Sequence, residues 1–253
     1  IFLISDEIDT DIQQLIQKFS NIHNSTVILH PGKDSYKKDY LTNQIKTNYI
    51  ILLEGNVIVT NDYSTKMIHA LKQSSYAGIV SVLSNNASFQ SLPTVDQSNM
   101  AFIDLPKNTS EDQMNRLCEV WSVAHVIPRV PLLNPFCLGL TKDTFIALGG
   151  FSAFIPNNSF GISDFSFRAT ELGIDQIIAT NTYVYHAKAK KESVSEMPSL
   201  QNVLETLGKT YGRERVIRSY QTMLFHPVLL ELRRRMQYIY NMEDIGEILA
   251  HED

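Results

Sequence analysis

The 253-residue sequence lacks the features that mark several common protein classes. It has two cysteines, Cys118 and Cys137, without a CxxC spacing. A disulfide framework or a zinc site is therefore not expected, and a reducing compartment is the simpler interpretation. No apolar run approaches the roughly 18 residues of a membrane span. The formal net charge of −5 provides no positive surface for nucleic acid.

Two further motifs are missing. The predicted strand-to-helix turns carry neither a GxGxxG nor a Walker-type loop, which argues against the commonest nucleotide-binding α/β enzymes. The short apolar run at the start of the sequence ends at Asp6 and lacks the basic leader of a secretory signal. We therefore expect a cytoplasmic protein with no membrane span and no nucleic-acid partner. Hydrophobic residues still make up 43% of the chain, which is enough for a folded core.

Short apolar runs alternate with helical patterns through the first half of the chain. Strands are expected at residues 1–5, 26–29, 49–53 and 78–83, and helices at residues 11–19, in the stretch that ends near residue 46, and at residues 60–73. Asn61 or Asp62 is the expected cap of the third helix. This order of strands and helices predicts an α/β layered domain with parallel strands.

The second half begins with a long polar segment, residues 84–107, and loops of that length are often functional. Beyond it we expect helices at residues 110–124, 142–148 and 163–172, and strands at residues 136–140, 176–179 and 182–186. Gly149 and Gly173 are expected to end two of these helices. From about residue 200 the pattern is helical. We therefore divide the chain into a domain at residues 1–197 and a helical C-terminal extension at residues 198–253.

Six segments together suggest a family. They are IILLEGNV at residues 50–57, GIVSVLSNNA at 78–87, RVPLLNPFCLGL at 129–140, LGGF at 148–151, DFSFRATELG at 164–173 and TYVYHAK at 182–188. Their content and order resemble family 2 glycosyltransferases, and the resemblance runs from about residue 1 to residue 215. It implies a GT-A fold, a mixed, mainly parallel sheet flanked by helices. It also implies that residues 1–6 are the second strand of that fold, so that the first βα unit is missing and the chain is part of a longer chain or assembly.

The resemblance implies a site for a nucleotide-sugar. Asn56 and His186 match the cation ligands of the family, so manganese or magnesium is the implied cofactor. Asp6, Glu54 and Lys188 are the implied contacts to the nucleotide. The residues themselves leave simpler roles open: a polar strand exit without metal for Glu54 and Asn56, a turn residue for Asp6, and a solvated face for Lys188.

The implied catalytic base is Asp164, but its acidic neighbours are absent. The family places a carboxylate pair just before this position, where the chain has Gly161 and Ile162, or Ile162 and Ser163 with the alignment shifted by one. The turn after Phe151 has also lost its acid. Asp164 could instead cap the helix or pair with Arg168 at i+4.

Two functions follow from this degenerate active site. The first is an inverting glycosyltransferase that moves a sugar from a nucleotide-sugar to a glycan, lipid-linked or protein acceptor. The second is a pseudoenzyme, a glycosyltransferase-like module that binds glycan or nucleotide or scaffolds a partner protein. The missing acids favour the second function, and the sequence leaves both open.

Overall fold

The computed structural model describes residues 45–95, 102–122, 127–134, 136–149, 159–187, 200–242 and 248. The side chains of residues 159–163, 200, 202 and 203 are not included in that description. The strands predicted at residues 1–5 and 26–29 and the first two predicted helices lie outside the described residues.

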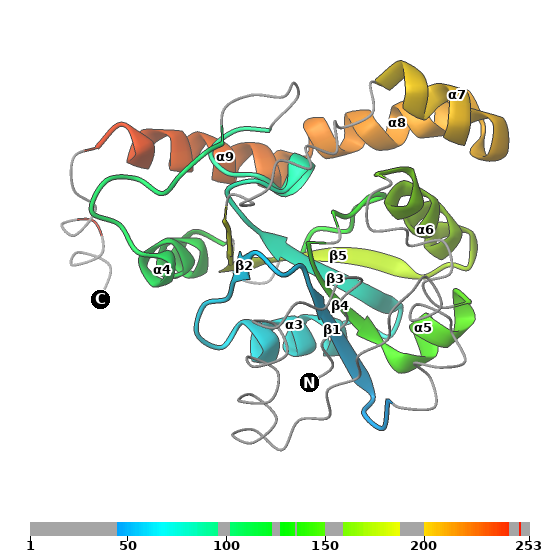
Figure 1. Cartoon of the computed structure of the whole chain (residues 1–253), viewed down its shortest axis with the longest axis horizontal. Helices are drawn as coiled ribbons and strands as arrows, with labels where there is room; N and C mark the ends of the chain where they lie inside the picture. Colours follow the sequence, from blue (N-terminus) through cyan, green and yellow to red (C-terminus); the bar gives the residue numbers. More distant parts are fainter. Residues whose placement is uncertain are drawn as a thin grey trace, which may run out of the picture.

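A four-stranded mixed sheet lies at the centre of the molecule (Figure 1). Its strands, in spatial order, are β1 (Tyr49–Leu53), β4 (Cys137–Thr141), β3 (Ala77–Leu83) and β5 (Asp175–Tyr183). β4 is antiparallel to both of its neighbours, whereas β3 and β5 are parallel. Three of these four strands therefore run in one direction, which confirms the mixed, mainly parallel sheet. A separate antiparallel pair joins β2 (Val57–Ile58) to β6 (Tyr185–His186).

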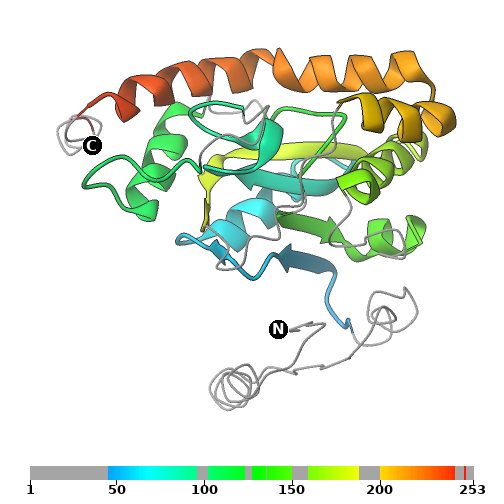
Figure 2. The same ribbon diagram turned by 45° about the horizontal axis from the view of Figure 1, so that its top comes forward.

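Helices cover the sheet. They are α3 (Tyr63–Lys72), α4 (Glu111–Trp121), α5 (Lys142–Ala147), α6 (Ser159–Glu171), α7 (Leu200–Tyr211), α8 (Arg213–Leu224), α9 (Pro227–Tyr240) and the 3-10 turn η2 (Ser88–Gln90). Figure 2 shows α8 and α9 lying across the sheet. None of the helices in the described part of the chain is long and apolar enough to cross a membrane.

The alternation of side chains along β3 and β5 creates two hydrophobic clusters. Ile79 and Ile178 belong to the larger cluster, which includes residues of α4 and α6–α9. Val80 and Ile177 belong to the smaller cluster, which includes α3 through Met67 and its neighbours. Both faces of the sheet are therefore covered, as continuous apolar strands require.

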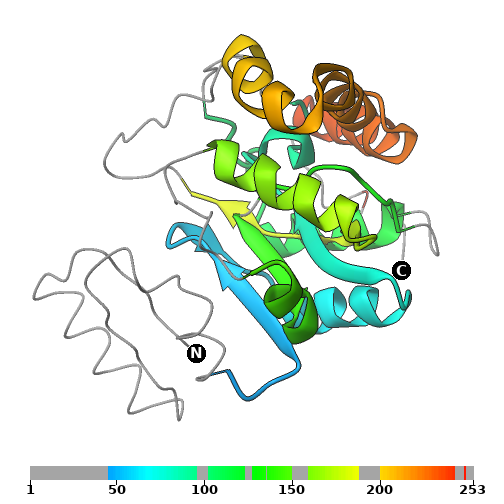
Figure 3. The same cartoon turned by 90° about the vertical axis from the view of Figure 1, so that its right-hand side faces the viewer.

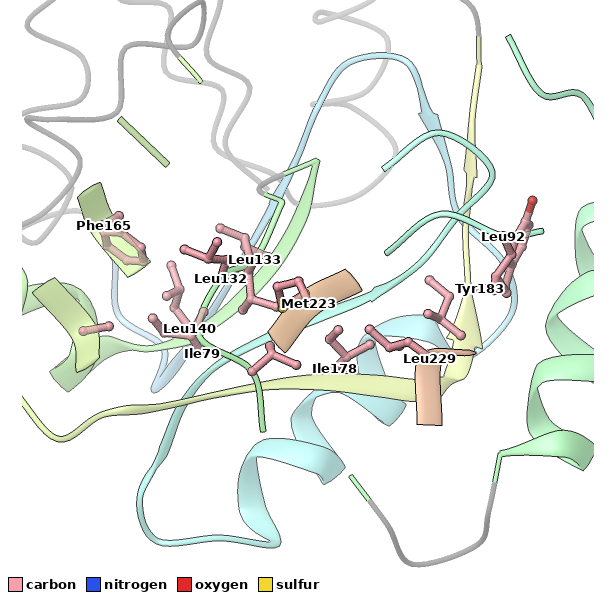
Figure 4. Close-up of a cluster of buried hydrophobic side chains, with 14 of the residues drawn as sticks. Ile79, Leu92, Leu132, Leu133, Leu140, Phe165, Ile178, Tyr183, Met223 and Leu229 are labelled. Atoms are coloured by element: carbon pink, nitrogen blue, oxygen red, sulfur yellow. The ribbon is translucent and has the colours of Figure 1, made fainter. Parts of the chain in front are cut away.

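The C-terminal helices contribute directly to the larger cluster. Met223 of α8 and Leu229 of α9 lie near Ile178 of β5 (Figure 4), in the cluster that also contains Ile79. Residues 200–240 are helical, as expected, and the boundary at residue 198 stays a prediction. Because these helices share the core of the sheet, changes in α8 or α9 reach the rest of the fold through packing.

The ends of three helices have defined caps. Ser110 and Gln113 form a capping box at the start of α4, next to the acidic Glu111. The predicted glycine stops are confirmed. Gly149 and Gly173 follow α5 and α6 with φ of 79° and 70°, a left-handed conformation that favours glycine.

Two predictions of local structure need correction. Asp62 occupies the predicted N-cap position of α3, but its side chain makes no capping hydrogen bond, and Asn61 bonds to Asp112 of α4. The strands expected at residues 176–179 and 182–186 are also placed differently. β5 continues to Tyr183 through a register shift, and the chain then turns at Val184 into β6. Such irregularities redirect a strand, and this one carries His186 away from the sheet to β2.

Candidate functional site

The pairing of β2 with β6 positions three of the predicted site residues. Val57 is opposite His186 in the register. Asn56 and Ala187 exchange two hydrogen bonds: the Asn56 Nδ2 group donates to the Ala187 carbonyl at 2.8 Å, and the Ala187 N–H donates to the Asn56 carbonyl at 2.8 Å. Glu54, Asn56 and His186, which are distant in the sequence, therefore lie at one place in the fold.

The imidazole of His186 is held on several sides. Its Nε2 atom is 3.3 Å from Glu54 Oε2, and its Nδ1 atom is 2.6 Å from the Asn86 carbonyl oxygen. The Asn85 side chain accepts from the His186 N–H at 2.8 Å and donates to its carbonyl at 3.2 Å. The ring stacks on Phe136 with a centroid distance of 5.8 Å and an interplanar angle of 17°. The position and the orientation of the ring are both determined by these contacts.

Both ring nitrogens of His186 face acceptors, and this affects the charge of the ring. Burial by itself lowers the pKa of His186, and it is the largest single influence. The hydrogen bonds to Glu54 and to the Asn86 carbonyl together outweigh it, so the pKa of His186 is raised above its ordinary value. Without another cation, the protonated ring pairs with the Glu54 carboxylate.

The same arrangement suits a divalent cation. When the neutral ring donates Nδ1–H to Asn86, the Nε2 lone pair points toward Glu54, and metal-binding histidines commonly have this backbone support. The side chain of Glu54 is 45% exposed, and a Cβ atom added at Gly55 would meet nothing within 4 Å. Within the described residues, no group of three His, Cys, Asp or Glu side chains is placed to hold a metal. Phosphate oxygens of a ligand would therefore have to complete the coordination.

The asparagines of the segment after β3 were missed as site residues. Asn85 and Asn86 both donate through Nδ2 to the Ile103 carbonyl, at 2.7 and 2.9 Å, while they also hold His186. The available signal was the SNNA sequence at residues 84–87 at the start of a long polar segment. The partner on a distant strand could not be deduced from that signal.

Asp164 has different surroundings. It lies within α6, where its Oδ2 atom accepts from Arg168 Nε at 2.9 Å and its Oδ1 atom accepts from the Tyr211 hydroxyl at 2.5 Å. Figure 3 shows α7, which carries Tyr211, next to α6. The alternative pairing with Arg168 is therefore observed. The alternative role as a helix cap is wrong, since α6 begins at Ser159.

Asp164 is not joined to the His186 region. Within the described part of the chain, no hydrogen bond or ion pair connects Asp164 to Glu54, Asn56 or His186. Burial, followed by the hydrogen bond to Asp164, raises the pKa of Tyr211 well above its ordinary value, so this hydroxyl stays a donor at neutral pH.

Asp6 and Lys188, the other predicted nucleotide contacts, lie outside the described residues.

Comparison with known proteins identifies the fold. No family model and no curated protein matches the chain. A crystal structure of GalNAc-T7 with UDP, GalNAc and Mn²⁺ matches 99% of this chain with a TM-score of 0.52 and 13% identity. The mannosyltransferase PcManGT from Pyrobaculum calidifontis, in complex with GDP-Man and Mn²⁺, also matches 99% with a TM-score of 0.52, at 10% identity. The chain covers 51% of the first protein and 68% of the second. These similarities show that the chain has the GT-A fold of glycosyltransferases.

Proposed function

We propose that this chain is a nucleotide-sugar-dependent glycosyltransferase of the inverting type, with a glycan, lipid-linked or protein acceptor. The observation that carries the proposal is the pair formed by Glu54 and His186, held in place by Asn86. The two similar structures support it: one contains UDP, GalNAc and Mn²⁺, and the other contains GDP-Man and Mn²⁺.

In this proposal Glu54 and His186 hold manganese or magnesium, with the amide oxygen of Asn56 as a weaker neighbour. The cation offsets the negative charge of the donor diphosphate. Asn86 fixes the histidine ring so that Nε2 faces Glu54. Asp6 contacts the donor base, Lys188 contacts the phosphates, and Asp164 is the general base.

A second candidate, binding without sugar transfer, is favoured by the contacts of Asp164. A general base must lie within hydrogen-bond reach of the proton that it removes, with its carboxylate directed toward that proton. Both carboxylate oxygens of Asp164 already accept a hydrogen bond, one of them from the cationic Arg168. In this candidate the chain binds a nucleotide or a glycan, or scaffolds a partner protein, and Asp164 has a purely structural role.

A screen of nucleotide-sugars, with and without manganese, separates the two candidates. Donor hydrolysis or transfer that requires manganese, and that is lost in Glu54→Gln and in Asp164→Asn, would support the glycosyltransferase. Manganese-dependent nucleotide binding without turnover would support the second candidate. If neither binding nor turnover depends on Glu54, the glycosyltransferase and the nucleotide-binding form of the second candidate are both wrong. Glu214→Gln, which changes an exposed carboxylate of α8, is the control variant.

A further inference from the structure

Arg233 is a buried cation that has no carboxylate partner among the described residues. It lies on α9 with 6% of its surface exposed, and none of the ion pairs within the described residues includes it. Burial lowers its pKa to about 10, so the guanidinium stays charged at neutral pH. Burying an unpaired charge is costly unless the charge is fully hydrogen-bonded, and the partners of Arg233 therefore indicate what it does.

Those partners are backbone carbonyls, two of them in one short loop. Arg233 Nη2 donates to the Phe89 carbonyl, and Nε donates to the Ser91 carbonyl at 3.4 Å. Nη1 donates to the Leu224 carbonyl at the end of α8, at 3.3 Å. The 3-10 turn η2 lies against α9 (Figures 1 and 2). The planar guanidinium suits this task because its donors point in fixed directions.

The loop that Arg233 holds is the loop that orients His186. Residues 84–92 form a closed unit in which the Leu92 N–H donates to the Ser84 carbonyl at 2.9 Å and the Ala87 N–H donates to Ser91 Oγ at 2.7 Å. Asn85 and Asn86 lie within this unit and hold His186. A charge on α9 is thus connected to the candidate site through one short segment of backbone.

We infer that Arg233 is a positioning residue, which fixes the loop at residues 84–92 so that Asn85 and Asn86 hold His186 in its binding orientation. The value of this orientation for a nucleotide-sugar rests on the proposed function. The inference gives the C-terminal helices a part in the site in addition to their part in the core.

Amide hydrogen exchange followed by NMR tests this inference directly. The His186 N–H donates to Asn85 Oδ1 and the Ile103 N–H donates to Asn86 Oδ1. Arg233→Met should accelerate exchange at both amides about tenfold more than Met236→Ala does. Met236 is buried on the same helix, and its side chain has no donor for the loop carbonyls. Each variant is measured at the same interval below its own Tm. Equal acceleration in the two variants would overturn the inference.

Arg233→Lys provides a second, milder variant if Arg233→Met does not fold. A lysine keeps the charge but not the fork of donors, so exchange at the His186 and Ile103 amides should lie between wild type and Arg233→Met. Exchange no faster than in wild type would contradict the positioning role.

Titration of UDP or GDP with manganese is the third readout, and Arg233→Lys should weaken the affinity about threefold to tenfold. If the wild-type chain binds neither nucleotide, the proposed function fails, while the exchange data still decide the role of Arg233.

Discussion

Glu54 and Asp164 are two carboxylates in segments that resemble glycosyltransferase motifs, but their surroundings differ. The side chain of Glu54 is 45% exposed and faces His186. The imidazole of His186 can be cationic or neutral. Asp164 is 30% exposed and is bound by a permanent cation and by a hydroxyl from another helix. The first carboxylate can exchange its partner for a metal ion, whereas the charge of the second is already satisfied. Two positions that resemble motifs of one family therefore have different surroundings: Glu54 is open to a ligand, whereas both oxygens of Asp164 are engaged within the fold.

The largest expected effect is on nucleotide binding. His186→Ala removes the imidazole that Asn86 orients, and we expect it to weaken manganese-dependent binding of UDP or GDP about a hundredfold. Calorimetry measures this change. His69→Ala is the matched control, because His69 is exposed on α3 and pairs with Gln73 of the same segment. Equal affinities in wild type and His186→Ala would remove His186 from the site.

The second effect concerns Asp164 and is expected on stability. Asp164→Asn should lower the free energy of unfolding by about 1–2 kcal/mol, because half-buried Arg168 loses its carboxylate. Urea denaturation measures this loss, and nucleotide affinity should stay the same. The exposed pair of Glu214 and Arg218 has the same i,i+4 spacing, and Glu214→Gln should cost at most about 0.5 kcal/mol. Loss of sugar transfer without loss of stability in Asp164→Asn would mean that Asp164 is the base after all.

Asn56 is the proposed cation ligand without a charge, and replacing it with a carboxylate tests the cation site. Asn56→Asp adds a second carboxylate near Glu54 and His186 and should raise the affinity for manganese about tenfold. It also removes the donor to the Ala187 carbonyl, so a small loss of stability is expected. Asn108→Asp makes the same change of charge at an exposed position. Equal gains in both variants would point to net charge and not to coordination.

The smallest effect is a dependence on pH. As pH rises, the contribution of His186 to stability should fall, whereas the affinity for the cation should increase. Because the folded-state pKa of His186 is raised above its ordinary 6.5, its contribution to stability is fully present below about 6.5 and is lost as pH rises through the raised value. Cation affinity should increase over the same interval, since only the neutral ring can bind a metal. Thermal unfolding and manganese titration of wild type and His186→Gln measure the two trends. If both rose together with pH, the pairing of Glu54 with His186 would be excluded as their cause.

Much of the fold could be predicted from the sequence because its signals are local. The apolar run of β3 and the glycines after α5 and α6 each act over a few neighbouring residues. The path of the chain after β5 could not be predicted in this way. Its register shift depends on pairing with β3, almost a hundred residues earlier in the sequence.

The candidate site shows the same limit. The roles of Asn56 and His186 were implied by a family resemblance, but the support from Asn85 and Asn86 depends on a loop contact across about a hundred residues. The hydroxyl of Tyr211 that reaches Asp164 comes from α7, which the sequence assigned to a separate extension. Contacts of this kind depend on how distant segments pack, so a local sequence pattern does not predict them.

Calorimetric titration of UDP and GDP in the presence of manganese, on wild type, Glu54→Gln and Asp164→Asn, tests the central contrast most directly. We predict that at least one nucleotide binds wild type and Asp164→Asn with equal affinity, and that its binding requires manganese. We also predict that Glu54→Gln weakens this binding about tenfold or more. Binding that is lost in Asp164→Asn and kept in Glu54→Gln would contradict the account.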